Sequence, residues 1–121
     1  MVQVETLFSV IDNSGVRKVK CIKVLGRKVA RPGDMVVVSV KRVSPNKKIT
    51  KGAIFYAVLV NTSKSYYRST GFFLKSLDNQ GVLLKSSLDT SPYANRVSGV
   101  VYNEVRLNGF SKIASLTSDL I

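Results

Sequence analysis

Short strand-forming segments separated by closely spaced turn signals constrain the fold of this chain more than any other feature. The segments are residues 6–11, 16–25, 35–43, 53–60, 72–77 and 81–85. β-Branched and aromatic residues favour strands, whereas runs of Asp, Asn, Ser, Gly and Pro reverse the chain. Many short strands at close spacing are typical of a small closed barrel rather than an open sheet. We therefore predict a mainly β protein built on a small five-stranded β-barrel.

The sequence gives more detailed predictions for residues 16–25, for residues 35–43 and for the turn that follows them. Residues 35–43 contain five valines, which we assign to the core. In residues 16–25 the alternation is imperfect, and it predicts Val19, Cys21 and Lys23 on one face, with Cys21 as a small buried filler. The polar turn at residues 44–48 predicts that residues 49–51 fold back on residues 35–43 as a basic hairpin.

The character of the sequence changes after Ser91-Pro92. Residues 101–107 and 110–116 place apolar side chains at helical separations, with Asn108-Gly109 as a stop between them. We predict two short C-terminal helices whose apolar residues cap one open end of the barrel. The whole chain, residues 1–121, then forms one domain, with the barrel over about residues 1–90 and the C-terminal loop and helices over about residues 91–121.

Positive charge is concentrated in one third of the chain. Residues 17–51 hold twelve of the nineteen Lys and Arg and one acid, a net charge of +11 out of +12 for the whole protein. Such one-sided charge is tolerated best beside a dense polyanion, and a nucleic-acid backbone is the leading candidate. The cations are Arg17, Lys18, Lys20, Lys23, Arg27, Lys28, Arg31, Lys41, Arg42, Lys47, Lys48 and Lys51.

Composition excludes most catalytic chemistry. The chain has no His and a single Cys, so a histidine-activated nucleophile, a histidine-bearing zinc site and an internal disulfide are impossible. Its seven acids are scattered, without the pairing that acid–base catalysis or a calcium loop requires. We predict neither an enzyme nor a cofactor. The longest apolar run is far shorter than the roughly 20 residues of a membrane-spanning helix, so we expect no membrane partner.

An ordered series of motifs resembles the universal large-subunit ribosomal protein number fourteen family, in its bacterial or organellar type. The resemblance covers essentially the whole chain in order. It rests on Val10-Ile11-Asp12-Asn13-Ser14-Gly15 with Arg17-Lys18, on Cys21-Ile22-Lys23-Val24-Leu25-Gly26, on Pro32-Gly33-Asp34, on Thr50-Lys51-Gly52, on Ala57-Val58-Leu59-Val60-Asn61-Thr62, on Leu77-Asp78-Asn79 with Val82-Leu83-Leu84, on Arg96-Val97-Ser98-Gly99, and on Lys112-Ile113-Ala114-Ser115-Leu116.

The resemblance implies a structural protein of the large ribosomal subunit that binds large-subunit rRNA and helps to form a bridge to small-subunit rRNA. It also implies two protein partners, large-subunit ribosomal protein nineteen and the ribosomal silencing factor. The family's interface patch maps onto Asn95, Arg96 and Lys112, of which the two cations are expected on the surface.

The chain departs from the family pattern at several positions. Ala94-Asn95 stands where the family usually has Gly-Thr, Val100 where it has Pro, and Asn61 where it has Arg. Such drift favours a mitochondrial matrix ribosome over one of the bacterial cytoplasm or plastid stroma, which are the alternatives.

Two local interpretations stay open. Asn13 and Ser14 form a tight turn, and their polar groups beside Arg17 and Lys18 also suit contacts to phosphate or ribose. Tyr66 and Tyr67 could stack on bases or pack against a neighbouring protein, and the second is preferred.

A free-standing RNA-binding barrel, acting as an RNA chaperone or translation factor, is the alternative function. Such barrels generally carry exposed aromatic side chains on a sheet face, where this chain offers mostly Val and Lys.

Overall fold

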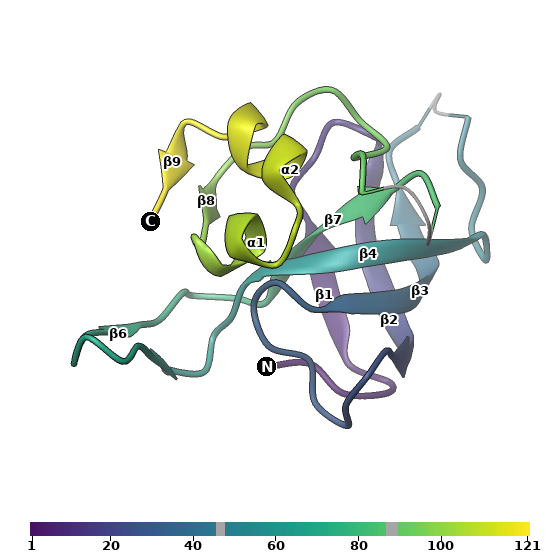
Figure 1. Ribbon diagram of the computed structural model, residues 1–121. Helices are drawn as coiled ribbons and strands as arrows, with labels where there is room; N and C mark the ends of the chain where they lie inside the picture. The colour runs from purple at the N-terminus through teal and green to yellow at the C-terminus, as the bar shows by residue number, and fades with distance from the viewer. Residues whose placement is uncertain (46–47, 87–89) are drawn as a thin grey trace.

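A closed β-barrel forms the centre of the computed structural model, which describes residues 1–45, 48–86 and 90–121 (Figure 1). Its strands follow the order β1-β2-β3-β4-β7. Parallel pairing of β1 with β7, with Ser9 opposite Gln80, closes the barrel, and the other neighbours are antiparallel. The predicted five-stranded barrel is therefore confirmed. The barrel strands are β1 (Leu7–Val10), β2 (Val16–Val24), β3 (Met35–Val43), β4 (Ile54–Asn61) and β7 (Gln80–Leu84).

The barrel interior is filled by alternate side chains of its strands. Phe8 is one of the largest fully buried residues, and Cys21 is buried as predicted. Of the five valines of β3, three are buried in this cluster, whereas Val37 and Val43 are half-buried. The interior cluster includes Phe8, Val10, Val16, Val19, Cys21, Val24, Val36, Val38, Val40, Ala57, Leu59 and Leu83.

Irregular pairing along β2 overturns the predicted face of Lys23. The register between β2 and β3 shifts at three places, the last between Cys21 and Lys23. A β-bulge adds one residue to one strand, so the side chains beyond it change face. Val24 therefore joins the buried interior, and Lys23 is exposed on the outside.

Strands β4 and β7 are buried on both faces. Leu59 and Leu83 face the barrel interior, whereas Val58 and Val82 belong to a second apolar cluster outside it. That outer cluster includes Val58, Val60, Val82, Leu84, Val97, Val101, Val105, Phe110 and Ile113. The nearly continuous apolar sequences of these strands reflect this double burial.

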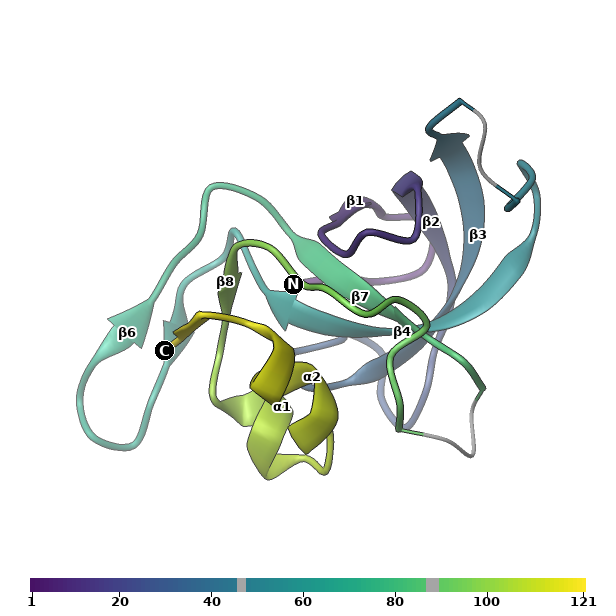
Figure 2. The same cartoon turned by 90° about the horizontal axis from the view of Figure 1, so that it is seen from above.

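The C-terminal region packs against the side of the barrel. Helices α1 (Glu104–Leu107) and α2 (Ser111–Leu116) lie over β4 and β7 in both views (Figures 1 and 2). The prediction of two short helices is confirmed, and the prediction that they cap an open end is wrong. The first helix is also shorter than predicted, because β8 (Val100–Val101) pairs in parallel with β9 (Asp119–Leu120).

A second small sheet forms an arm that projects from the barrel (Figure 2). Strands β5 (Tyr66–Tyr67) and β6 (Phe73–Leu74) pair with each other as a two-stranded sheet, and we call residues 66–74 the aromatic arm. Residues 49–51 form no strand, so the predicted hairpin there is wrong; β3 pairs instead with β2 and β4.

The close packing around Gly81, where the barrel closes, predicts that one added methyl group destabilises the protein. A Cβ there would lie 2.7 Å from Phe8 Cε2 and 3.0 Å from the Val58 carbonyl oxygen. Gly81→Ala should therefore lower the free energy of unfolding by about 1–3 kcal/mol, measured by urea titration. Phe8→Leu should lower the free energy of unfolding less in the Gly81→Ala background than in the wild type, because it removes part of the clash with the new methyl group. Simple additivity of the two changes would contradict this explanation.

Candidate nucleic-acid interface

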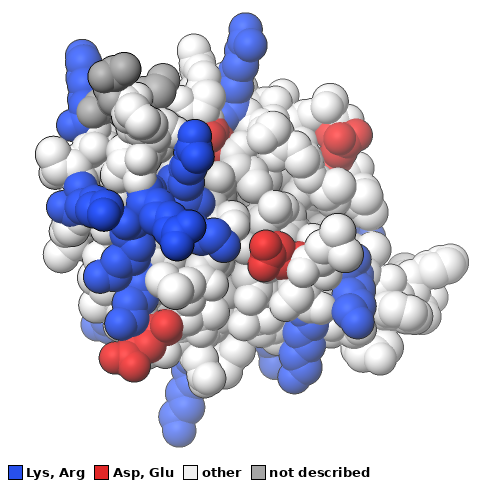
Figure 3. Space-filling model, turned by 180° about the vertical axis from the view of Figure 1, so that it is seen from behind, with Lys and Arg blue, Asp and Glu red and all other residues white. Residues whose placement is uncertain are grey.

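Six cations lie along the outside of strands β2 and β3, and we call this set the hairpin wall. Lys18 on β2 is directly opposite Arg42 on β3, so the two strands bring their charges together. Figure 3 shows Lys and Arg gathered on one side of the rear face. The hairpin wall consists of Arg17, Lys18, Lys20, Lys23, Lys41 and Arg42.

The hairpin wall is largely exposed, and its positive charges have no acidic partner among the described residues. Lys18 and Lys20 are half-buried and the other four cations are exposed. Over residues 1–45, 48–86 and 90–121, the ion pairs are Arg27–Asp34 and Arg68–Glu104, and neither includes a cation of the wall. The Arg17 Nε donates a hydrogen bond to Ser44 Oγ at 2.9 Å, which fixes this side chain across the hairpin. A fixed scaffold thus presents unpaired positive charge to solvent.

A second group of cations lies around the connection between β2 and β3. Arg27, Lys28 and Arg31 of this connection and Lys64 from the segment after β4 line a hollow of about 550 Å³. We call these four residues the loop cluster, and all are exposed. The Asp34 carboxylate accepts a hydrogen bond from the Arg31 backbone N–H and pairs with Arg27 at 3.2 Å. The one acid of the basic segment therefore shapes the loop.

Asp12 organises the turn between β1 and β2. Its Oδ1 accepts hydrogen bonds from the Ser14 backbone N–H and from Ser14 Oγ, and its Oδ2 accepts one from the Leu83 N–H at 3.1 Å. The Ser14 hydroxyl is thus engaged within the turn. The Asp12 side chain joins the turn to β7, the strand that closes the barrel.

Burial of the Asp12 carboxyl raises its pKa above the ordinary value, while the donors of Ser14 and Leu83 act in the opposite direction. A carboxyl whose pKa is higher in the folded than in the unfolded protein binds its proton more tightly in the folded state. Ionisation of Asp12 therefore costs stability at neutral pH. That cost disappears as the pH falls below the ordinary pKa of the unfolded chain.

The turn also holds part of the predicted interface patch. Asn13 Nδ2 donates to Asn95 Oδ1 at 2.7 Å, and Asn13 Oδ1 accepts from the Arg96 backbone N–H at 3.2 Å. The structure thus brings together Asn13, predicted to bind RNA, and Asn95 and Arg96 of the patch. Lys112 on α2 donates from Nζ to Ser91 Oγ at 2.8 Å. Asn95, Arg96 and Lys112 are all exposed.

The remaining predicted residues lie between β3 and β4. Lys48 and Lys51 are exposed there, and Lys47 falls outside the described residues. Two residues that sequence reasoning did not select also belong to this surface, Lys64 in the loop cluster and Leu7 beside the hairpin wall. Leu7 could have been found from alternation, because Phe8 and Val10 point into the barrel.

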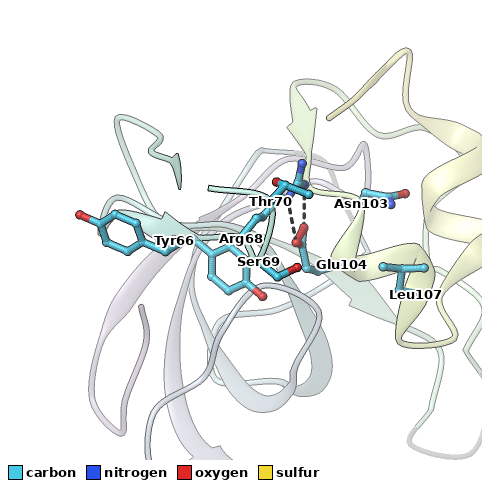
Figure 4. Close-up of a pocket in the computed structure, with 8 residues that line it drawn as sticks. Tyr66, Arg68, Ser69, Thr70, Asn103, Glu104 and Leu107 are labelled. Atoms are coloured by element: carbon cyan, nitrogen blue, oxygen red, sulfur yellow. Dashed lines mark hydrogen bonds and ion pairs between the residues drawn. The ribbon is translucent and has the colours of Figure 1, made fainter. Parts of the chain in front are cut away.

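Another hollow lies at the base of the aromatic arm (Figure 4). Arg68 points to Glu104 and forms two hydrogen bonds with it, from Nε at 3.0 Å and from a terminal nitrogen at 2.8 Å. This partner raises the pKa of the Arg68 guanidinium. The bidentate pair ties the arm to α1 and occupies both charged groups. Arg68 and Glu104 therefore hold the arm in place, and neither is free to act as an acid or a base in catalysis.

Within residues 1–45, 48–86 and 90–121, no three His, Cys, Asp or Glu side chains are grouped as a metal site would require. Among the helices of the same ranges, none is long and apolar enough to span a bilayer.

These observations define the class of protein: a small β-barrel with a basic outer wall, an apolar C-terminal cover and a projecting aromatic arm. Comparison with known families gives the more particular assignment. Residues 1–121 match the family described as ribosomal protein L14p/L23e, and the chain belongs to this family. It is accordingly a structural, non-enzymatic protein of the large ribosomal subunit, as the resemblance of its motifs implied.

The turn contacts predict that Asp12→Ala destabilises the barrel. The change leaves the backbone N–H groups of Ser14 and Leu83 without their acceptor, which should lower the free energy of unfolding by about 2 kcal/mol. Asp12→Asn is the matched control. It keeps the shape of the side chain and one of its two acceptor oxygens, so it should lower the free energy of unfolding by less. Urea titrations of both variants test the point, and equal stability of Asp12→Ala and wild type would contradict the assigned role.

Proposed function

We propose that the hairpin wall and the loop cluster bind large-subunit rRNA and so anchor this protein in the subunit. The observation that carries the proposal is the row of six cations on two paired strands, which form no ion pair with an acid within residues 1–45, 48–86 and 90–121. Lys and Arg neutralise phosphates and release counterions, and Arg can grip two phosphate oxygens at once. Folded RNA is read mainly through its shape and backbone, which suits a rigid cationic surface.

Anchoring through phosphates predicts that Arg17→Glu/Lys18→Glu impairs incorporation into the large subunit without unfolding the barrel. Both side chains lie outside the apolar interior, so thermal unfolding followed by circular dichroism should stay near that of the wild type. Lys85→Glu/Arg106→Glu, two exposed cations outside the wall, is the matched control for the change in net charge. Sedimentation of tagged proteins should place the control, but not the wall variant, in large-subunit fractions. Equal incorporation would refute anchoring by the wall.

We also propose that Asn95, Arg96 and Lys112 contribute to a bridge with small-subunit rRNA. The patch is exposed, and its first two residues are held by the Asn13 turn. Phosphate on the facing RNA would be attracted by both cations of the patch.

This bridge predicts that Arg96→Glu/Lys112→Glu leaves the large subunit assembled but weakens subunit joining. Two acids would face phosphate, and the defect should be greatest at low magnesium, where the repulsion is least screened. The measurement is the ratio of joined ribosomes to free subunits on sucrose gradients across a magnesium series. A ratio equal to that of the wild type throughout the series would leave only the anchoring role.

Protein neighbours are proposed for two surfaces. The aromatic arm exposes 74% of Tyr67 and 73% of Phe72, and Arg68, its one charged residue, is paired with Glu104. An exposed apolar surface of low charge suits a protein partner better than RNA. Large-subunit ribosomal protein nineteen is the partner we propose for the arm. The ribosomal silencing factor is proposed for the patch of Asn95, Arg96 and Lys112.

We further propose the mitochondrial matrix as the compartment, based on the departures at Asn61, Asn95 and Val100 from the usual family pattern.

A free-standing RNA-binding barrel is less well supported, because β1, β2 and β3 expose no aromatic side chain that could act as a stacking platform. High-salt sedimentation separates the two functions, since an integral protein stays with the subunit whereas a factor is released.

A further inference from the structure

An aliphatic side chain lies exposed in the middle of the cationic surface. Leu7 on β1, Lys18 on β2, and Lys41 and Arg42 on β3 together line a hollow of about 320 Å³ that spans three neighbouring strands. Leu7 is 59% exposed. A single exposed Leu is ordinary on a protein surface, but here it belongs to a hollow whose other lining residues are all cations.

The chemistry of this lining matches one kind of occupant. One apolar side chain beside three positive charges fits a group that is flat and apolar on its faces and carries negative charge close by. A nucleotide has this character, because its base offers apolar faces and its two flanking phosphates are negative. A paired base must lose its pairing and stacking to enter such a hollow, whereas an unpaired base can be turned outward more easily.

We propose that the hollow holds one unpaired, bulged nucleotide of the bound RNA, with its base against Leu7 and its phosphates against Lys18, Lys41 and Arg42. The proposal rests on the RNA-binding function proposed for the hairpin wall and adds a structural preference to it. Arg42 can also stack its planar guanidinium on the base. The wall alone would recognise any RNA backbone, whereas the hollow makes the protein prefer RNA that offers an unpaired base.

Two RNA probes test this preference. Both are the same stem-loop, and one carries a single unpaired adenosine in its stem. The wild-type protein should bind the bulged RNA about tenfold more tightly than the fully paired one. Leu7→Ala should bind both RNAs equally, because the apolar contact to the base is lost. Ile54→Ala is the matched control: Ile54 is 66% exposed on the same barrel but does not line the hollow, so its variant should keep the preference.

Salt dependence separates the base contact from the phosphate contacts. Leu7→Ala should leave the slope of log affinity against log salt unchanged, because it removes no cation. Lys18→Gln/Arg42→Gln should reduce the slope by about 1.5 for both RNAs, at roughly 0.7 to 0.9 per phosphate. With 2-aminopurine at the unpaired position, the wild type should raise its fluorescence by taking the base out of the stack, and Leu7→Ala should not.

The outcomes are distinct. Equal binding of both RNAs by the wild type, or equal loss of the preference in Leu7→Ala and Ile54→Ala, would overturn the assignment of the hollow to an unpaired nucleotide. Binding that does not vary with salt for either RNA would instead overturn the RNA-anchoring function itself.

Discussion

Closure of the barrel by β1 and β7 is the contact on which the other features depend. The two strands pair in parallel beside Gly81, where the Phe8 ring and the Val58 carbonyl leave no room for a side chain. Closure removes the free edges that an open sheet of five strands would expose. It also brings Asp12 to the Leu83 N–H, which fixes the turn that holds Asn95 and Arg96. A residue near the start of the chain thereby positions residues more than eighty positions later.

The unequal burial of the barrel wall divides the molecule into two sides. Strands β4 and β7 are covered by α1 and α2, so their outward positions can be apolar. On strands β2 and β3 this cover reaches Met35 at the start of β3, and the exposed positions of the two strands include the cations of the hairpin wall. The like charges of the hairpin wall repel each other, and the apolar interior behind the wall must offset that repulsion. The same hairpin therefore combines a valine-rich inner face with a cationic outer one.

Sequence reasoning could predict the strands and the closed barrel because each segment shows its own local pattern of strand formers and turn formers. It could not predict the face of Lys23, because the register shifts that expose it arise from pairing with β3. The position of the helices was missed for a related reason. Apolar runs such as Val58 to Val60 indicate burial on both faces, but they do not say which segment provides the second layer. The hairpin at residues 49–51 was predicted from local turn signals, whereas β3 already has partners on both sides.

The candidate site shows the same division between local and long-range information. Twelve cations in one segment are evident from the sequence, but their arrangement into a wall and a loop cluster depends on the pairing of β2 with β3. Lys64 joins the loop cluster from outside that segment, so no inspection of the charge run alone would include it. Leu7 becomes a candidate contact residue only because the pairing of β1 with β2 places it beside cations, since a single exposed leucine is ordinary on a protein surface. The features that we propose to distinguish one RNA from another are thus assembled by the fold, whereas the positive charge that we propose to attract RNA is already evident from the sequence.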